Sequence, residues 1–171
     1  IKEAYFTAGI NEYLKRLRPV FPVTVHEVKD LPAPNNASAA QIAQLVEQEG
    51  QKLLAQLSPD ALVVALAIKG SQLGSMELAE KLAEWSASGR RALVFVIGGS
   101  YGLAPAVLQR ADFQLSFGPA TFPHQLMRLI LCEQIYRSVK INRNELIRAP
   151  DCMRWVLPAI MEVIRRFPSM C

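Results

Sequence analysis

The sequence predicts an α/β fold in which helices cover both faces of a parallel sheet. Two stretches, 61–68 and 92–97, are apolar throughout rather than alternating, and a strand that is apolar on both faces belongs inside a parallel sheet. Segments with helical spacing alternate with these strands, which is the order that crossover connections of a parallel sheet produce. The chain has 171 residues, of which 51% are hydrophobic and 20% charged, enough for one domain with its own core.

The first part of the chain predicts two helices separated by a short strand. Residues 2–17 carry apolar side chains at three- and four-residue spacing, and the two prolines that follow end this helix. The β-branched run 23–28 predicts a strand, and the proline-containing stretch 30–36 predicts a loop. Ser38 is a suitable N-cap for a helix that continues to about Leu57.

The remaining elements follow in the same alternating order. We expect the strand 61–68 to end at Lys69-Gly70, and we expect Ser75 to cap a helix that stops at Gly89. The strand 92–97 leads into a glycine-rich turn and a short helix to about Arg110. The last elements are a short strand at 113–117, a loop at 118–122, and a long helix over roughly 124–140 with Pro123 as its first residue.

Composition excludes several classes of protein. The formal charge of +4, from 19 basic and 15 acidic residues, permits an anionic partner such as RNA. Three widely spaced cysteines and two histidines predict neither a metal site nor a disulfide scaffold, and they favour a cytoplasmic protein. No apolar run approaches the roughly 20 residues of a membrane span, and the amphipathic beginning of the chain is not typical of a signal peptide.

Ligands of parallel sheets bind at the carboxyl ends of strands, so the ends after Ile68, Ile97 and Phe117 are candidate sites. The turn 98–102 matches neither the dinucleotide-binding nor the P-loop pattern. It is either a place where the backbone approaches a flat ligand or a tight strand-to-helix turn. The small residues and prolines of 117–123 predict a stiff loop whose unpaired backbone groups bind a heterocycle or water.

Charged residues of the last helix provide further candidates. His124 is either a base or a structural residue at the helix start. Arg128, Arg137, Lys140 and Arg143 form either a solvated face or an edge that contacts phosphates, and the last three share one side of the helix.

Several motifs in order carry a resemblance to a known family. They are Leu-Ala-Ile-Lys-Gly at 66–70, Phe-Val-Ile-Gly-Gly-Ser-Tyr-Gly-Leu at 95–103, the segment 115–128 with Thr-Phe-Pro-His-Gln-Leu-Met-Arg, Glu-Gln-Ile-Tyr-Arg at 133–137, and Lys-Ile-Asn-Arg at 140–143. Together they resemble the RlmH family, bacterial SPOUT-class enzymes that methylate N3 of a pseudouridine in 23S rRNA. The resemblance covers about residues 1–143.

The resemblance implies a trefoil-knotted fold, a homodimer, the ribosome as partner, and S-adenosylmethionine held in the knot, with neither a metal nor a membrane involved. The cofactor-binding residues that it implies are Leu66, Gly98, Phe117, Gly118, Pro119, Ala120, Thr121 and Phe122, the last six around the adenine. Arg137, Lys140 and Arg143 become candidate RNA contacts. An apolar wall suits a sulfonium that must stay unhydrated to react.

The chain departs from the family pattern in three places. The strand with which the family begins has no counterpart here, and Ala67 stands where the family has an acidic residue. We divide the chain into a methyltransferase domain, 1–145, and a divergent extension, 146–171, which lacks the family's terminal Tyr-His pair and in which we expect a short helix near 159–167. No residue is identified as the catalytic base, so the alternative is a dimer that binds the cofactor but is catalytically impaired.

Overall fold

The computed structural model describes residues 2–28, 34 and 36–145. In chain order the elements are α1 (Lys2–Leu17), α2 (Ala39–Gln56), β1 (Ala61–Gln72), α3 (Ser75–Ala87), β2 (Ala92–Ile97), α4 (Pro105–Arg110), β3 (Phe113–Ser116) and α5 (His124–Asn142). The predicted extension 146–171 and its short helix lie outside the described residues.

The three strands form one parallel sheet in the order β2-β1-β3. β1 is therefore the central strand, and its residues 61–65 are all buried, as the unbroken apolar run predicts. A strand flanked by a neighbour on each edge and by helices on each face has no side in contact with water. The predicted parallel α/β sheet is confirmed.

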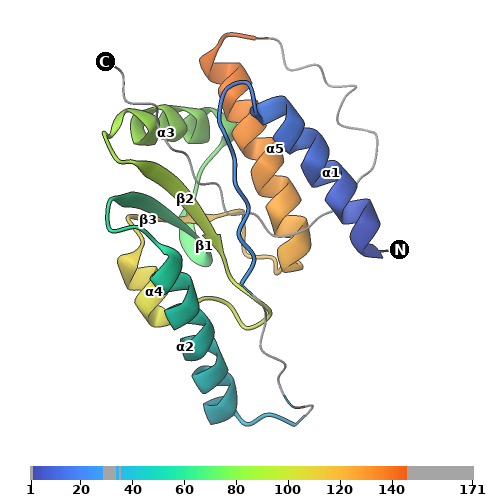
Figure 1. The fold of residues 1–171 in the computed structure, drawn as a ribbon, viewed down its shortest axis with the longest axis vertical. Coiled ribbons are helices and arrows are strands. Elements are labelled where there is room, and N and C mark those ends of the chain that lie inside the picture. Colours follow the sequence, from blue (N-terminus) through green and yellow to red (C-terminus); the bar gives the residue numbers. More distant parts are fainter. Residues whose placement is uncertain (1, 29–33, 35, 146–171) are drawn as a thin grey trace.

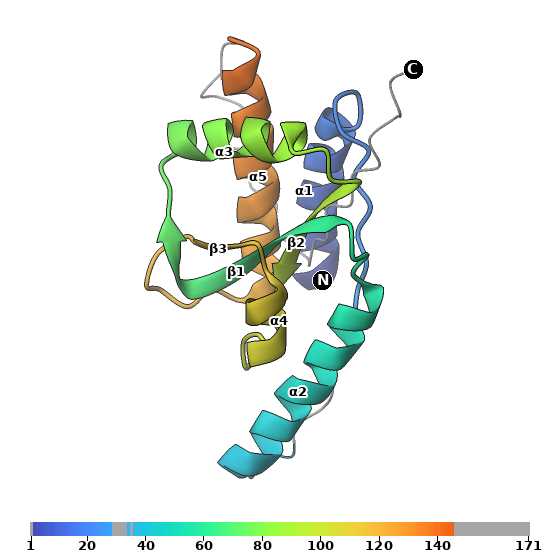
Figure 2. The same ribbon diagram turned by 90° about the vertical axis from the view of Figure 1, so that its left-hand side faces the viewer.

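Helices cover the two faces of the sheet unequally (Figures 1 and 2). One face packs against α1, α3 and α5 around a core that includes Phe95, Leu115 and Leu131. The other face packs against α2 and α4, where Val63 and Val107 are fully buried. Figure 2 shows α2 extending away from the sheet, and its residues that pack against this smaller core begin at Val46.

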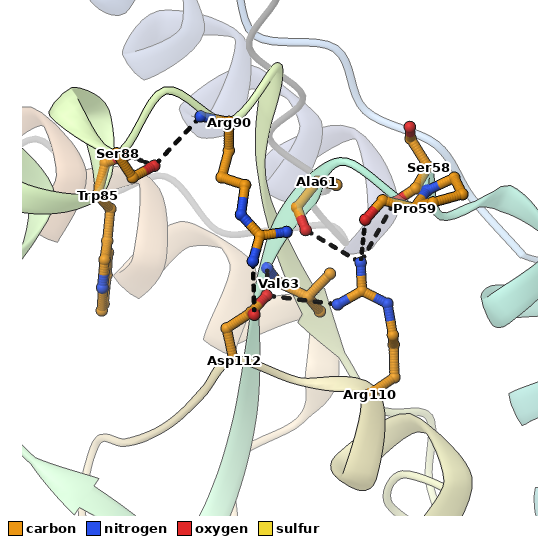
Figure 3. A network of polar contacts seen from close by, with 9 residues as sticks. All are labelled: Ser58, Pro59, Ala61, Val63, Trp85, Ser88, Arg90, Arg110 and Asp112. Atoms are coloured by element: carbon orange, nitrogen blue, oxygen red, sulfur yellow. Dashed lines mark hydrogen bonds and ion pairs between the residues drawn. The ribbon is translucent and has the colours of Figure 1, made fainter.

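A network of polar contacts holds the amino ends of the strands together (Figure 3). The Asp112 carboxylate accepts a hydrogen bond of 2.8 Å from the Val63 backbone N–H, and the Asp112 N–H donates one of 2.8 Å to the Val63 carbonyl. Arg110 donates to the backbone carbonyls of Ser58, Pro59 and Ala61 at 3.0–3.3 Å and to Asp112. The network therefore joins the start of β1 to the start of β3, at the opposite end of the strands from the candidate site.

Helix ends agree with the sequence where local chemistry sets them. Ser38 accepts a hydrogen bond from the Gln41 N–H and Gln41 accepts one from the Ser38 N–H, so the predicted N-cap of α2 is a complete capping box. Gly89 has a φ of +74°, the left-handed conformation that ends α3. The prediction for Ser75 was wrong by one position, because Gly74 is the N-cap and its N–H bonds to the Glu77 carboxylate.

Three other predictions differ from the structure. The run 23–28 is not a strand: Val23 and Val25 pack against the larger core, but the described residues provide no neighbouring strand to pair with this backbone. β1 does not end at Lys69-Gly70 but continues to Gln72. Pro123 is the N-cap of α5 rather than its first helical residue.

Candidate functional site

Leu66, in the middle of β1, lies between the carboxyl ends of β2 and β3. Leu66 is paired in register with Ile97 of β2 and with Leu115 of β3. Gly98 and Phe117 are the residues that immediately follow β2 and β3. The structure therefore brings Leu66, Gly98 and the beginning of the loop 117–123 to one edge of the sheet, as the sequence predicts.

β1 makes an irregular excursion at this edge. After Leu66 the strand leaves its ladder with β3, and it returns at Ser71, which is paired with the same Leu115. An added Cβ on Gly70 would lie 2.6 Å from the Gln114 carbonyl oxygen, so only glycine allows the excursion to cross β3 at this distance. From the sequence Gly70 is expected only to end a strand, and its closeness to β3 is not predicted.

The glycine turn after β2 is tightly closed on itself. Gly99 and Gly102 form an isolated bridge, and the Gly102 N–H donates to the Gly99 carbonyl at 3.1 Å. A Cβ on Gly98 would lie 2.7 Å from the Gly102 carbonyl carbon. Of the two interpretations offered for this segment, the tight turn is the one that these contacts describe, and Tyr101 at its tip is half exposed.

The loop 117–123 is held by a residue that the sequence analysis did not single out. The buried Ser116 hydroxyl lies 2.9 Å from the Ile68 carbonyl, to which it donates, and accepts a hydrogen bond of 3.2 Å from the Gly118 N–H. It thus links the excursion of β1 to the loop. Gly118 has a φ of +114°, which disfavours any residue with a side chain. A small hydroxyl residue at the end of a buried strand was the available signal.

The basic residues of α5 do not form a single group. Arg128 is buried, with 2% of its surface exposed, and pairs with Glu27 at 2.9 Å. The expectation that it lies on a solvated or phosphate-contacting face is therefore wrong, because its position continues the buried side of the helix formed by Leu131 and Ile135. His124 begins α5 and is half-buried.

The remaining cations lie toward the end of α5 and each has an acidic partner. Arg137 pairs with Glu133, while Lys140 and Arg143 both pair with Glu145. Arg137 and Lys140 belong to α5, and Arg143 is its C-cap residue. Because each has an acidic partner, the three are not an uncompensated positive edge.

α1 brings further side chains to this part of α5. The Tyr13 and Tyr136 rings meet edge to face at a centroid distance of 5.8 Å. The Arg16 guanidinium and the Lys140 ammonium lie 5.8 Å and 5.6 Å from the Tyr136 ring centroid, which is within the range of cation–π attraction. Sequence spacing within α5 alone gave no sign of this contribution from a helix that is remote in the chain.

Comparison with known proteins assigns the family. A family model described as a SPOUT methyltransferase matches residues 1–146. The chain belongs to the RlmH family of SPOUT methyltransferases. Relatives named ribosomal RNA large subunit methyltransferase H are 52% identical in Carboxydothermus hydrogenoformans and 48% identical in Enterococcus faecalis, each over 145 residues, 85% of this chain and 91% of the relative. A relative of the same name from an Exiguobacterium species is 50% identical over the same shares.

Membership of the RlmH family makes the chain a member of a group of enzymes that transfer methyl groups. The match spans all of the strands and their carboxyl ends, so the site described above lies within it. Within the part of the chain that the structure describes, no helix is long and apolar enough to cross a membrane. The same residues contain no group of three or more histidine, cysteine, aspartate or glutamate side chains placed to hold a metal ion.

Proposed function

We propose that this protein uses S-adenosylmethionine to methylate N3 of a pseudouridine in the 23S rRNA of the bacterial ribosome. The observation that carries the proposal is the convergence of Leu66, Gly98 and the loop 117–122 at the carboxyl edge of the sheet. Relatives of about 50% identity are named as large-subunit rRNA methyltransferases.

The residues at this edge fit the proposed donor. Gly118 in its left-handed conformation has no Cβ, and nothing lies within 4 Å of the place where one would stand. This leaves open space beside Gly118 for the adenine, with Phe117, Pro119, Ala120, Thr121 and Phe122 around it, while the Gly118 N–H itself is engaged by Ser116. Leu66 and the two phenylalanines supply apolar walls. When bound, S-adenosylmethionine supplies a methyl group on a cationic sulfonium.

The chain's own contribution to the reaction is positioning and the exclusion of water. An in-line displacement needs the nucleophilic nitrogen, the methyl carbon and the sulfur aligned, and orientation of this kind accounts for much of the rate enhancement of transfer enzymes. Ser116 links the β1 excursion to the loop by hydrogen bonds, and the lack of a side chain at Gly70 lets the excursion pass close to the Gln114 carbonyl.

We also propose the trefoil knot that the family resemblance implies. Its support is that the match to the SPOUT methyltransferase family model spans residues 1–146. We further propose that the methyltransferase domain spans 1–145, ending shortly after α5.

A homodimer formed through α5 is part of the proposal. Leu126 and Ile130 are only half-buried in the single chain and are available for a subunit contact, whereas Val139 belongs to the core. Light scattering at micromolar concentration is expected to give twice the chain mass, and a monomeric mass contradicts this part.

The surface that combines Arg16, Tyr136, Lys140 and Arg143 is the proposed rRNA contact. Aromatic rings flanked by cations bind RNA by stacking and by phosphate contacts. The acidic partners of these cations reduce the net charge, so each cation that engages RNA must exchange a carboxylate for a phosphate. We expect substitution of Lys140 and Arg143 with glutamine to make ribosome binding less sensitive to salt. The slope of the logarithm of the binding constant against the logarithm of the salt concentration should fall in magnitude by about one for each phosphate that is no longer neutralised.

The deciding experiment is transfer of tritium from labelled S-adenosylmethionine to ribosomes that lack the modification. We expect label in 23S rRNA, located at N3 of one pseudouridine, and no label on ribosomes that already carry the methyl group. Absence of donor binding by calorimetry contradicts the proposal at its first step.

A second candidate function is a dimer that binds the donor without transferring its methyl group. The observation that favours it is Ala67, which follows Leu66 directly and places no acidic group at this edge. In that case calorimetry shows donor binding while tritium transfer stays at background. Loss of a positioned base costs roughly 10²–10⁴-fold in rate, so the two candidates are separable by a single-turnover measurement.

A further inference from the structure

Arg128 is the buried charge that the fold leaves incompletely satisfied. The side chain is 2% exposed, and its Nε and Nη2 atoms are both buried without a hydrogen-bond partner among the residues that the structure describes. Only Nη1 is used, in the 2.9 Å ion pair with Glu27. Because an unpaired buried donor on a charged group is costly, two on one guanidinium need an explanation.

The two unpaired atoms form a geometric unit. Nε–H and one N–H of Nη2 project in parallel from the same edge of the planar guanidinium, and this pair is the fork that matches the two oxygens of a carboxylate or phosphate. The Glu27 contact is made by the remaining nitrogen, Nη1. The unpaired edge therefore has the geometry that binds one bidentate oxyanion.

Neighbouring groups do not satisfy this fork. Cys132 lies one helical turn away, but burial raises the pKa of its thiol to about 12, so the sulfur is neutral at physiological pH. Burial also lowers the pKa of Arg128 to about 10, which still leaves it a cation near pH 7. The site is thus a permanent positive charge without a matching anion on its fork.

Arg128 is close in the chain to the proposed donor site. α5 begins at His124, directly after the loop 117–123, and Arg128 lies one turn, about 6 Å, along the helix. It shares the buried face of the helix with Leu131, Cys132 and Ile135, which belong to the larger core. Arg128 therefore stands on the buried face of α5, one turn from the loop that is proposed to hold the donor.

The segment that contains Glu27 lies next to the guanidinium. The Glu27 side chain is 65% exposed, so the guanidinium with which it pairs lies one layer beneath the surface. Residues 21–28, which include Glu27, belong to no helix or strand. An RNA backbone is too bulky to enter a position at this depth, whereas the end of a small ligand is not.

We infer that Arg128 binds the α-carboxylate of the amino-acid end of the methyl donor, through Nε and Nη2. This assignment rests on the proposed function, since it requires the donor to be S-adenosylmethionine. It gives α5 a role in ligand binding as well as in packing. The carboxylate also balances the buried cation, so donor binding and the stability of this region are coupled.

The test compares two nucleosides that differ in the carboxylate. S-adenosylhomocysteine carries the amino-acid end and 5′-methylthioadenosine lacks it, while both carry the adenine. We expect calorimetry on the wild-type chain to show S-adenosylhomocysteine binding about 10- to 100-fold more tightly, the range of a charge-assisted bidentate contact. Arg128→Met should reduce this ratio to about 3-fold or less and leave the affinity for 5′-methylthioadenosine unchanged.

Two further variants separate the fork from charge and from folding. Arg128→Lys keeps the cation but not the fork, so most of the discrimination should disappear. Glu27→Gln keeps the fork and removes only the ion pair, so the discrimination should remain. The affinity for 5′-methylthioadenosine reports in each variant whether the adenine site is intact.

Three results overturn the inference. If the wild-type chain binds both nucleosides equally, the proposed donor stands and the role of Arg128 is wrong. If Arg128→Lys and Arg128→Met keep the wild-type ratio, or lose both affinities in parallel, Arg128 is a structural residue. If the wild-type chain binds neither nucleoside, the proposed function fails and this inference fails with it.

Discussion

Asp112→Ala should destabilise the fold by about 2–3 kcal/mol, whereas Asp112→Asn should cost about 1 kcal/mol or less. Both substitutions remove the negative charge that faces Arg90 and Arg110. They differ in that asparagine keeps a side-chain oxygen able to accept the hydrogen bond from the Val63 backbone.

The difference follows from what each contact is worth in its surroundings. Val63 is fully buried, and its N–H donates to Asp112 at 2.8 Å. Removing this acceptor leaves a buried amide unpaired, which costs about 1–3 kcal/mol. The ion pairs are weaker, because the side chains of Arg90, Arg110 and Asp112 are 43%, 27% and 32% exposed and the distances are 3.3–3.5 Å; such pairs contribute about 0–1 kcal/mol.

Equilibrium unfolding in urea, followed by far-ultraviolet circular dichroism at fixed protein concentration, measures both variants. A loss of 2–3 kcal/mol corresponds to a fall in Tm of roughly 4–12 °C for a chain of this size. Asp60→Ala is the matched control: Asp60 also faces an arginine, Arg91, at 3.7 Å, but these side chains are 62% and 84% exposed, so the change should stay within about 0.5 kcal/mol. Donor affinity should be unchanged in all three, because the network lies at the amino end of the strands.

Equal destabilisation by alanine and asparagine would refute this reasoning, since it would mean that the charge and not the backbone hydrogen bond is the main contribution. The reasoning would also be refuted if the unfolding free energy of Asp112→Ala differed from that of the wild type by less than about 0.5 kcal/mol.

Three other changes give distinct outcomes. Gly98→Val should abolish binding of S-adenosylhomocysteine in calorimetry, because even a Cβ would lie 2.7 Å from the Gly102 backbone. Gly74→Ala is the control and should bind S-adenosylhomocysteine normally, because its Cβ would meet only a side-chain oxygen at 3.5 Å. Ser116→Ala should weaken the binding of S-adenosylhomocysteine by roughly 5- to 10-fold, because it removes a hydrogen-bonded link of about 1 kcal/mol or slightly more between the β1 excursion and the loop. Unchanged affinity would mean that this link does not help to shape the donor site. With the other two cysteines replaced by serine, Cys132 should resist thiol reagents at pH 8 until the chain unfolds. Because burial raises the pKa of this thiol to about 12, the unfolded thiol ionises near pH 9 while the native one keeps its proton, so unfolding free energy should fall as pH rises above about 9.

Local patterns in the sequence were sufficient for most of the architecture. The helix over 2–17, the Ser38 cap and the buried strand at 92–97 depend on contacts between near neighbours or on burial of a whole run, and the structure confirms each of them. The run 61–68 does lie in β1, but only residues 61–65 are buried and Ile68 is 56% exposed. The strand ends that the sequence selected as ligand sites also meet, since parallel strands all present their carboxyl ends at one edge.

Features that depend on remote partners were not predictable in this way. The run 23–28 has strand-like composition, yet a strand exists only where a neighbouring strand accepts its hydrogen bonds. Gly70 is important because a Cβ at this position would lie 2.6 Å from the carbonyl oxygen of Gln114 in β3, more than forty residues later in the chain. Nothing in the local sequence distinguishes Ser116 from other serines. Its role depends on the fold, which brings the Ile68 carbonyl and the Gly118 amide within hydrogen-bonding distance of its hydroxyl.

Arg128 shows the difference most clearly. From its place in an amphipathic helix it is expected to be a surface charge, because arginines are rarely buried. Its actual surroundings are set by Glu27, which is 101 residues away in the chain, and by the core packing of α5 against the sheet. Composition and periodicity specify which side chains avoid water, and that is enough to order the helices and the central strands. Which polar groups are enclosed with them, and which of those are left without a partner, depends on the three-dimensional meeting of distant segments.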